Sequence, residues 1–197
     1  MVDEFNVLVP RSGLAGLWDR FIGPNATPAE NTLIIASAIA GAIAATLRLS
    51  LLGFSGVPLA VGAFLGLDVI GGAVCNTTDT TKRWYHRPEV TWTQHIAFVL
   101  PHVAYIAAVA WLFSSSSGFD WYYFELMSAY LMVAAAAVLI APVYLKRPTA
   151  TIMYLLAIGL GLYQVGQTLG MEWFIPALFL KLLIGHLVPE LPSKASN

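Results

Sequence analysis

The sequence predicts an all-α protein: a polytopic membrane protein with a six-transmembrane-helix bundle and an N-terminal interfacial amphipathic helix. Three observations lead to this fold class. Of the 197 residues, 58% are hydrophobic and only 11% are charged, whereas soluble domains carry about 25% charged residues. The mean hydropathy is +0.72. Apolar runs of roughly 20 residues recur along the chain, as transmembrane helices require.

The chain divides into three regions. We expect residues 1–30 to form a cytoplasmic leader, residues 31–190 the six-helix transmembrane domain, and residues 191–197 a cytoplasmic tail. The net charge of -1 argues against nucleic acid as a partner. The single cysteine, Cys75, excludes an intramolecular disulfide framework. The polar N-terminal segment lacks the basic and apolar regions of a secretory signal.

Residues 12–23 form the expected amphipathic helix of the leader. Ser12 is a suitable N-cap. The apolar side chains lie near one face of this helix: Leu14, Leu17, Trp18, Phe21 and Ile22. Such a helix lies in the membrane interface with its apolar side toward the acyl chains. The alternative is a leader without fixed structure.

Six apolar stretches account for the spans. Each is about long enough to cross a ~30 Å hydrocarbon core at 1.5 Å per residue. We place them at 32–52, 56–75, 95–113, 122–145, 149–167 and 173–188. The short connections predict that consecutive helices are antiparallel neighbours. Small residues at 36–45 and 134–137 favour close helix packing.

Lysine and arginine are distributed unevenly over the loops. With the N-terminus inside, eight of them are cytoplasmic and the opposite loops contain none. The eight are Arg11, Arg20, Lys82, Arg83, Arg87, Lys146, Arg147 and Lys194. The positive-inside rule then predicts that both termini are cytoplasmic. We expect an integral, multi-pass protein of a bacterial inner membrane.

The second span carries a polar face. At 100° per residue, one side of this helix presents Asp68, Gly71, Gly72, Cys75, Asn76 and Asp79. Glycines let a neighbouring backbone or a ligand approach closely. This face therefore indicates either a polar site or a glycine-mediated helix contact in which Asp68 is satisfied locally.

Lys181 is the most unusual residue of the sequence, because it lies at the centre of the sixth span with eight residues on each side. An ammonium at this depth costs roughly 2.5–3.5 kcal/mol on insertion scales, so it requires an acid, a cavity or a ligand. Asp68 lies at a similar depth, and an ion pair between them is allowed if the two helices touch. His186 follows Lys181 by five residues, about 140° around an α-helix, which predicts different partners for the two.

All four histidines lie in the inner half of the bundle. His95 and His102 are seven residues apart on one face of the third span, which Pro101 should kink. Histidine titrates near physiological pH and suits a proton relay, although a satisfied core group is the simpler interpretation. Neither His86 nor His186 has metal-ligand spacing to another histidine, so we expect no metal and no cofactor.

The inner loop at 76–88 is the longest polar segment between spans. Its Lys82, Arg83 and His86 are suited to binding a phosphate or a lipid headgroup. The alternative is a membrane anchor formed by cations and interfacial aromatic residues.

Three functions fit these patterns. The first is a small transporter or channel for a small solute or ion, with or without proton coupling. Its substrate or proton path would be formed by Asp68, His102, Lys181, Asn76, His95 and His186. The second is an enzyme acting on a lipid or phosphorylated substrate at the inner leaflet. The third is a non-catalytic subunit or assembly factor. Expected partners are the lipid bilayer, a small solute, ion or lipid, and a second copy in a homo-oligomer.

Overall fold

The computed structural model describes residues 9–166 and 168–190. The predicted tail at 191–197, with Lys194, and the last residue of the predicted fifth span, Gln167, lie outside the described residues. The described part of the chain is helical and contains no β-strand, only an isolated bridge between Ser114 and Thr168. The predicted all-α class is therefore confirmed.

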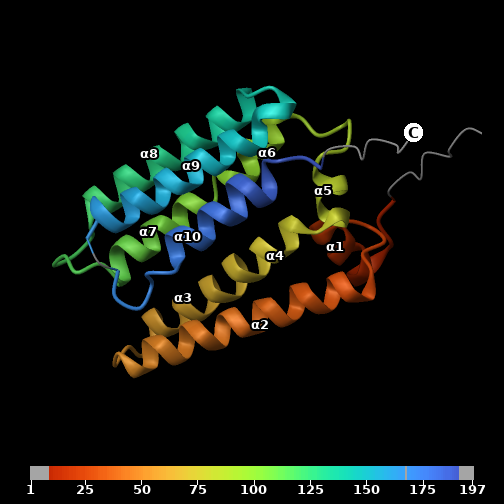
Figure 1. The fold of residues 1–197 in the computed structure, drawn as a ribbon. Coiled ribbons are helices and arrows are strands. Elements are labelled where there is room, and N and C mark those ends of the chain that lie inside the picture. Colours follow the sequence, from red (N-terminus) through yellow and green to blue (C-terminus); the bar gives the residue numbers. More distant parts are fainter. Residues whose placement is uncertain (1–8, 167, 191–197) are drawn as a thin grey trace, which may run out of the picture.

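The helices follow one another with short connections (Figure 1). The first part of the chain forms α1 (Gly13–Ile22), α2 (Pro28–Leu51), α3 (Val57–Leu65), η1 (Gly66–Ile70), α4 (Gly71–Thr77) and α5 (Asp79–Tyr85). The second part forms α6 (Trp92–Val99), α7 (His102–Leu112), α8 (Trp121–Ile140), α9 (Val143–Tyr163), α10 (Phe174–Phe179) and η2 (Leu180–His186). The two η segments are π-helical.

Four helices are long and apolar enough to cross a membrane, which indicates a multi-pass integral membrane protein. They are Pro28–Leu51, Val57–Thr77, Trp92–Leu112 and Trp121–Ile140. The predicted count of six is not confirmed. The helix α9 has 21 residues, but its first turns carry Lys146, Arg147 and Pro148. The apolar helix Phe174–His186 is shorter than a full span.

The turn after the fourth span was placed incorrectly by the sequence analysis, which extended that span to residue 145. The helix α8 ends at Ile140, and Ala141 has φ -59° and ψ 138°. A residue before proline avoids the α conformation, so Pro142 ends α8 and precedes α9. Pro148, which the predicted spans placed in the connection between the fourth and the fifth, lies inside α9.

Glycines bring α2 and the second span into close contact. A Cβ atom at Gly41 would lie 2.3 Å from the Gly66 carbonyl oxygen, and one at Gly66 would lie 2.4 Å from the Gly41 oxygen. A Cβ atom at Gly71 would lie 2.5 Å from that of Ala38. The small residues of α2 therefore do permit the close packing that the sequence predicted.

The last helix occupies the middle of the bundle. The segment η2 packs against α4 on one side and against α8 and α9 on the other, as Figure 1 shows for the blue helix between the yellow and cyan ones. Its side chains Leu182 and Leu183 are fully buried. Lys181 is thus carried into the interior of the protein and away from lipid.

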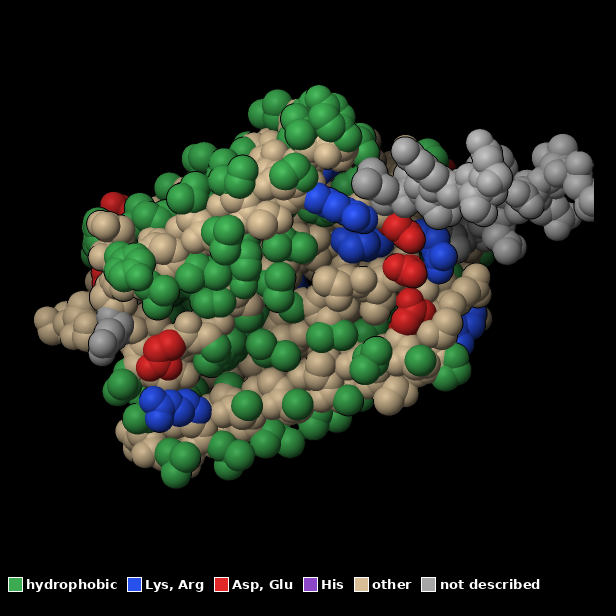
Figure 2. All heavy atoms as spheres, viewed as in Figure 1, with side chains coloured by type: hydrophobic (Ala, Val, Ile, Leu, Met, Phe, Trp, Pro, Cys, Tyr) green, Lys and Arg blue, Asp and Glu red, His purple; other side chains and the backbone are tan. Residues whose placement is uncertain are grey.

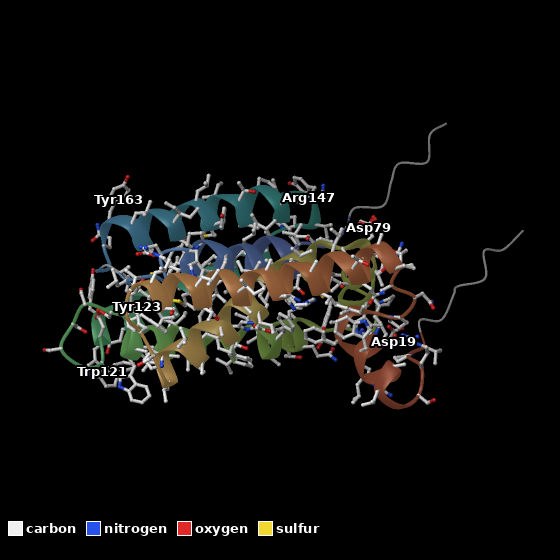
Figure 3. All side chains as sticks on the ribbon, turned by 90° about the horizontal axis from the view of Figure 1, so that it is seen from below. Asp19, Asp79, Trp121, Tyr123, Arg147 and Tyr163 are labelled. Carbon is white, nitrogen blue, oxygen red and sulfur yellow. The ribbon has the colours of Figure 1, made fainter. Side chains whose placement is uncertain are left out.

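Charged groups gather mainly at one end of the bundle. Figure 2 shows most of the Lys, Arg, Asp and Glu side chains of this face near α1 and α5, with hydrophobic side chains over the body between the two ends. In Figure 3, Asp19, Asp79 and Arg147 lie at this end, and Trp121 and Tyr163 lie at the opposite end. The arrangement matches an apolar belt between a highly charged surface and an aromatic one.

The amphipathic helix of the leader is present as α1. Leu14, Leu17 and Phe21 are exposed, and Ile22 is buried. The indole of Trp18 donates a hydrogen bond to the Asn31 side chain at the start of α2. Ser12 occupies the N-cap position, as predicted, although its side chain makes no capping hydrogen bond.

Candidate functional site

The lysine of the last helix forms an ion pair with the carboxylate of the second helix. Lys181 Nζ lies 2.6 Å from Asp68 Oδ2 and also donates to the Asp68 carbonyl oxygen at 3.3 Å. The Lys181 side chain is 4% exposed and the Asp68 side chain 20% exposed. The ion pair that the depths of the two residues allowed is therefore formed, inside the protein.

Both members of the pair lie on π-helical turns. Asp68 is within η1, and Lys181 is within η2. The π-helix closes its hydrogen bonds between residues i and i+5, and short π segments inside α-helices are frequent at functional sites. Neither turn was predictable from the sequence, because their apolar residues fit a continuous α-helix equally well.

The glycine face of α4 makes room for the lysine. A Cβ atom at Gly72 would lie 2.4 Å from Lys181 Cε and 2.8 Å from Nζ. One turn later, Asn76 Nδ2 donates to the Lys181 carbonyl oxygen at 3.2 Å. A Cβ atom at Gly185 would lie 2.9 Å from the Asn76 Cβ atom. The face thus makes a close helix contact, but Asp68 is not satisfied locally, because its carboxylate is bonded to Lys181.

His186 follows Lys181 by five residues on the same π-helical segment, and the two side chains have different partners. Lys181 is bonded to Asp68, whereas the His186 ring lies 3.1 Å from His95 Nδ1 and stacks on Phe98 with centroids 3.9 Å apart. The prediction of different partners agrees with these contacts, although the separation of 140° was that of an α-helix and does not apply to a π-helix. Phe98 connects the two surroundings, because it also lines the cavity that contains Lys181.

A cavity of about 260 Å³ adjoins the ion pair. It brings together Asp68, Lys181, Asn76 and His102, four of the residues that the sequence predicted for a path. The remaining wall is largely aromatic and apolar: Phe21, Tyr85, Phe98, Pro101 and Tyr105, with Gly72 and Ala97. A cavity of this size accommodates several water molecules or one small solute.

The break at Pro101 gives His102 its orientation. The helix α6 ends at Val99, α7 begins at His102, and His102 Nδ1 lies 3.0 Å from the Phe98 carbonyl oxygen. Because a carbonyl only accepts, Nδ1 carries the proton and Nε2 has the free lone pair. His102 Nε2 is buried and has no hydrogen-bond partner among the described residues. It is therefore available as a proton acceptor beside the ion pair.

The other three histidines converge at the charged end of the bundle. His95 Nδ1 lies 3.1 Å from His186 Nε2, and His86 Nε2 donates to the His186 carbonyl oxygen at 2.8 Å. His186 Nδ1 is buried without a partner in the described part of the chain. Within residues 9–166 and 168–190, no three His, Cys, Asp or Glu side chains are arranged to hold a metal ion.

The inner-loop residues predicted to bind a phosphate have other partners. The Lys82 ammonium donates to the carbonyl oxygens of Ile184, Gly185 and Val188, at 3.3, 2.8 and 2.7 Å. Burial lowers the pKa of Lys82 to about 8 and that of His86 to about 4. Lys82 has no N–H group left for an anion, so phosphate binding here would require it to leave the end of η2.

Several cavity residues escaped the sequence analysis. Tyr105 follows His102 by three residues, which is a same-face spacing on a helix, and this signal was available. Phe98 and Tyr85 line the cavity from α6 and α5, but apolar and interfacial aromatic residues carry no comparable signal.

Comparisons of the chain with protein-family models, with curated proteins and with solved structures gave no match. A function can therefore be inferred only from the geometry of the site.

Proposed function

We propose that the protein is a small multi-pass transporter or channel that moves a small solute or ion, coupled to protons, through the cavity at Asp68 and Lys181. One combined observation supports this proposal: a buried ion pair has a cavity of about 260 Å³ beside it, and that cavity is also lined by His102, whose Nε2 atom has no partner in the described residues. Ionisable groups within membrane spans commonly mark ion and proton paths.

The proposal includes a topology. Six crossings, with α9 and α10–η2 as the fifth and sixth, place both termini on the cytoplasmic side. This topology places the charged end, with α1 and α5, in the cytoplasm of a bacterial cell. Residues of the shorter last helix lie between other helices, which relaxes the length that a lipid-facing span requires.

The ion pair acts as a gate in this mechanism. While Asp68 is ionised, it holds Lys181 against Gly72 and keeps the pair closed. Protonation of Asp68 removes the Coulomb attraction, and in a low-dielectric interior that attraction is large. The ammonium then turns toward the cavity, where an anion, a water molecule or the His102 nitrogen becomes its partner. A proton and a solute thus alternate at one site.

Flux measurements test this proposal. In proteoliposomes with an entrapped pH-sensitive dye, the wild-type protein should dissipate an imposed pH gradient when potassium and valinomycin balance the charge. Asp68→Asn and Lys181→Met should abolish this flux. Glu125→Gln is the matched control, because it removes a carboxylate from α8 at an exposed position. Wild-type flux in both cavity variants would refute the proposal.

The enzyme and subunit alternatives fit the geometry less well. Acid–base work on a lipid needs Asp68 and a histidine within hydrogen-bond reach. In the described residues, Asp68 is instead bonded to Lys181, and His102 Nδ1 is bonded to the Phe98 carbonyl oxygen. A purely structural pair needs no cavity, whereas this one lines a cavity.

A further inference from the structure

A second and larger cavity, of about 570 Å³, lies at the charged end of the bundle. It is bounded by α1, by the segment from α5 to α6, and by η2. The side chains that matter for its chemistry are Arg20, Arg87, Trp84, Gln94, His95 and His186. The cavity therefore combines two guanidinium groups, an amide, two imidazoles and an indole.

The two arginines give this cavity a positive character. Arg20 is exposed, and among the described residues it forms no ion pair. The Arg87 guanidinium lies 3.8 Å above the Trp84 ring centroid and donates to the Trp84 carbonyl oxygen. Its one carboxylate neighbour in the described part is Glu89, at 3.6 Å and with a side chain 74% exposed. A water-exposed pair of this kind is weak, so a ligand anion can displace Glu89.

The inner wall of the cavity is polar and buried. His95 is 7% exposed and His186 is 2% exposed, and the two rings are joined by a hydrogen bond. His186 Nδ1 has no partner in the described residues. A buried polar atom of this kind normally has a partner, and His186 is one of the residues that line the cavity.

The position of the cavity indicates an amphiphile. It lies beside α1, whose exposed Leu14, Leu17 and Phe21 provide the apolar face of an interfacial helix. It also shares the wall residues Tyr85, Ala97 and Phe98 with the cavity of the ion pair. A ligand with an anionic head and an apolar body can therefore place the head between the arginines and the body along the aromatic wall.

We propose that this cavity binds the phosphate group of an amphiphilic ligand, with Arg20 and Arg87 pairing with the phosphate oxygens. Arginine guanidinium groups suit phosphate, because two parallel N–H donors match two oxygens. The same chemistry would take a phosphate from a lipid headgroup or from a soluble compound. Binding at this site is separable from the proposed transport, since Arg20 and Arg87 do not line the cavity of the ion pair and binding is measured without flux.

Ligand-induced stabilisation tests the site. The full chain in neutral detergent micelles is heated with increasing dihexanoyl phosphatidic acid, dihexanoyl phosphatidylcholine or inorganic phosphate, and the unfolding midpoint gives an apparent Kd. Phosphatidic acid should stabilise the wild-type protein, and the double variant R20Q/R87Q should bind it about tenfold more weakly or worse. The control R48Q/R147Q removes two exposed arginines that do not line the cavity and should bind normally.

The lipid and phosphate arms distinguish the two sources. Stabilisation by phosphatidic acid but not by inorganic phosphate identifies a headgroup, and equal stabilisation identifies a free phosphate. Gln94→Glu is a second variant for the case that R20Q/R87Q does not fold. Its carboxylate keeps the N-terminal cap that Gln94 makes with Thr91, and it adds a negative charge to the cavity. Weaker binding by this variant supports the site. The proposed site is refuted if R20Q/R87Q and the wild-type protein bind phosphatidic acid equally well, or if neither phosphatidic acid nor inorganic phosphate stabilises the wild-type protein.

Discussion

At Lys181, the cost of a buried charge is offset by geometry. The ammonium has two acceptors, the carboxylate and the carbonyl oxygen of Asp68, and Gly72 leaves the space that its methylene groups need. The similar depths of Lys181 and Asp68 allowed this pair from the sequence, but they could not show that the two helices touch. The π-turns that carry both residues were not predictable from helical phase, because a π-turn changes the number of residues per turn.

The ion pair should be strongly non-additive in stability. Asp68→Asn or Lys181→Met leaves one buried charge without its partner, and each should lower the free energy of unfolding by about 3–5 kcal/mol. The double variant removes both charges, so it should lose less than the sum of the two. A double-mutant cycle on unfolding in mixed micelles measures this coupling. Additive losses would show that the pair contributes nothing as a pair.

Gly72→Ala should be destabilising by about 1–3 kcal/mol, as overpacking of a filled site usually is. The new methyl group would lie against Lys181 Cε and Nζ and would push the ammonium away from Asp68. The matched control is Gly159→Ala in α9, where a Cβ atom meets nothing within 4 Å. This control should be neutral or slightly stabilising, because alanine has the higher helix propensity. Equal effects of the two substitutions on the thermal unfolding midpoint would argue against the contact.

Acid should destabilise the protein through His86. Its pKa falls to about 4 in the folded state because of burial, whereas the unfolded chain titrates near 6.5. Below about pH 6.5 the unfolded state binds the proton and the folded state does not, so this stability is present above pH 6.5 and is lost progressively as the pH falls toward 4. The unfolding midpoint should decline over this range. In His86→Gln, which keeps a donor for the His186 carbonyl oxygen, the unfolding midpoint should decline less. If the midpoint of this variant declines as much as that of the wild-type protein, other groups cause the loss of stability in acid.

At the scale of elements, the helix α5 fixes the end of η2. Three carbonyl oxygens at the C-terminal end of this segment accept from Lys82, and cations are favourable at helix C-termini. The sequence placed Lys82 at the correct end of the bundle. Its partners were out of reach of sequence reasoning, since they are backbone atoms about 100 residues away.

Lys82→Met should therefore lower the free energy of unfolding by about 1–3 kcal/mol, because it leaves buried carbonyl oxygens without a donor. Lys146→Met is the control, since the Lys146 side chain makes no ion pair within the described residues and its backbone N–H, which bonds to the Pro142 carbonyl oxygen, is unchanged by the substitution. Chemical unfolding in micelles compares the two. If both variants lose the same amount, the role of Lys82 at η2 is not specific.

The turn between α8 and α9 shows a limit of reading elements from hydropathy. Two prolines, Pro142 and Pro148, lie six residues apart, and each was a reasonable breaker. The structure uses Pro142, which follows Ala141 in an extended conformation. The predicted boundary between the fourth and fifth spans was placed at Lys146 and Arg147 because these residues are charged. Charged residues at the start of a helix are, however, compatible with a span whose end reaches the interface.

For the whole molecule, composition and charge were sufficient to predict a multi-pass helical protein with one charged end. The number of crossings was harder to predict, because the last helix is short and buried by its neighbours rather than by lipid. Hydropathy scales describe lipid-facing segments, and they do not distinguish a span from a helix enclosed by protein.

Accessibility to a membrane-impermeant maleimide tests the proposed topology. In a Cys75→Ser background, which removes the buried native thiol, Ser116→Cys in the outer turn should be labelled in intact cells. Asp79→Cys, at the charged end (Figure 3), should be labelled only after permeabilisation. Both positions are exposed, so lack of access would reflect the membrane. The reverse pattern would invert the orientation.

The two facing π-turns also bear on how this site arose. A π-turn contains one residue more than the α-turn it replaces, and every residue on one side of it is rotated by about 100° relative to a plain α-helix. Point substitutions in an ordinary helical bundle preserve residue count and would not create this register. Single-residue insertions, one in each of the two helices, would create it.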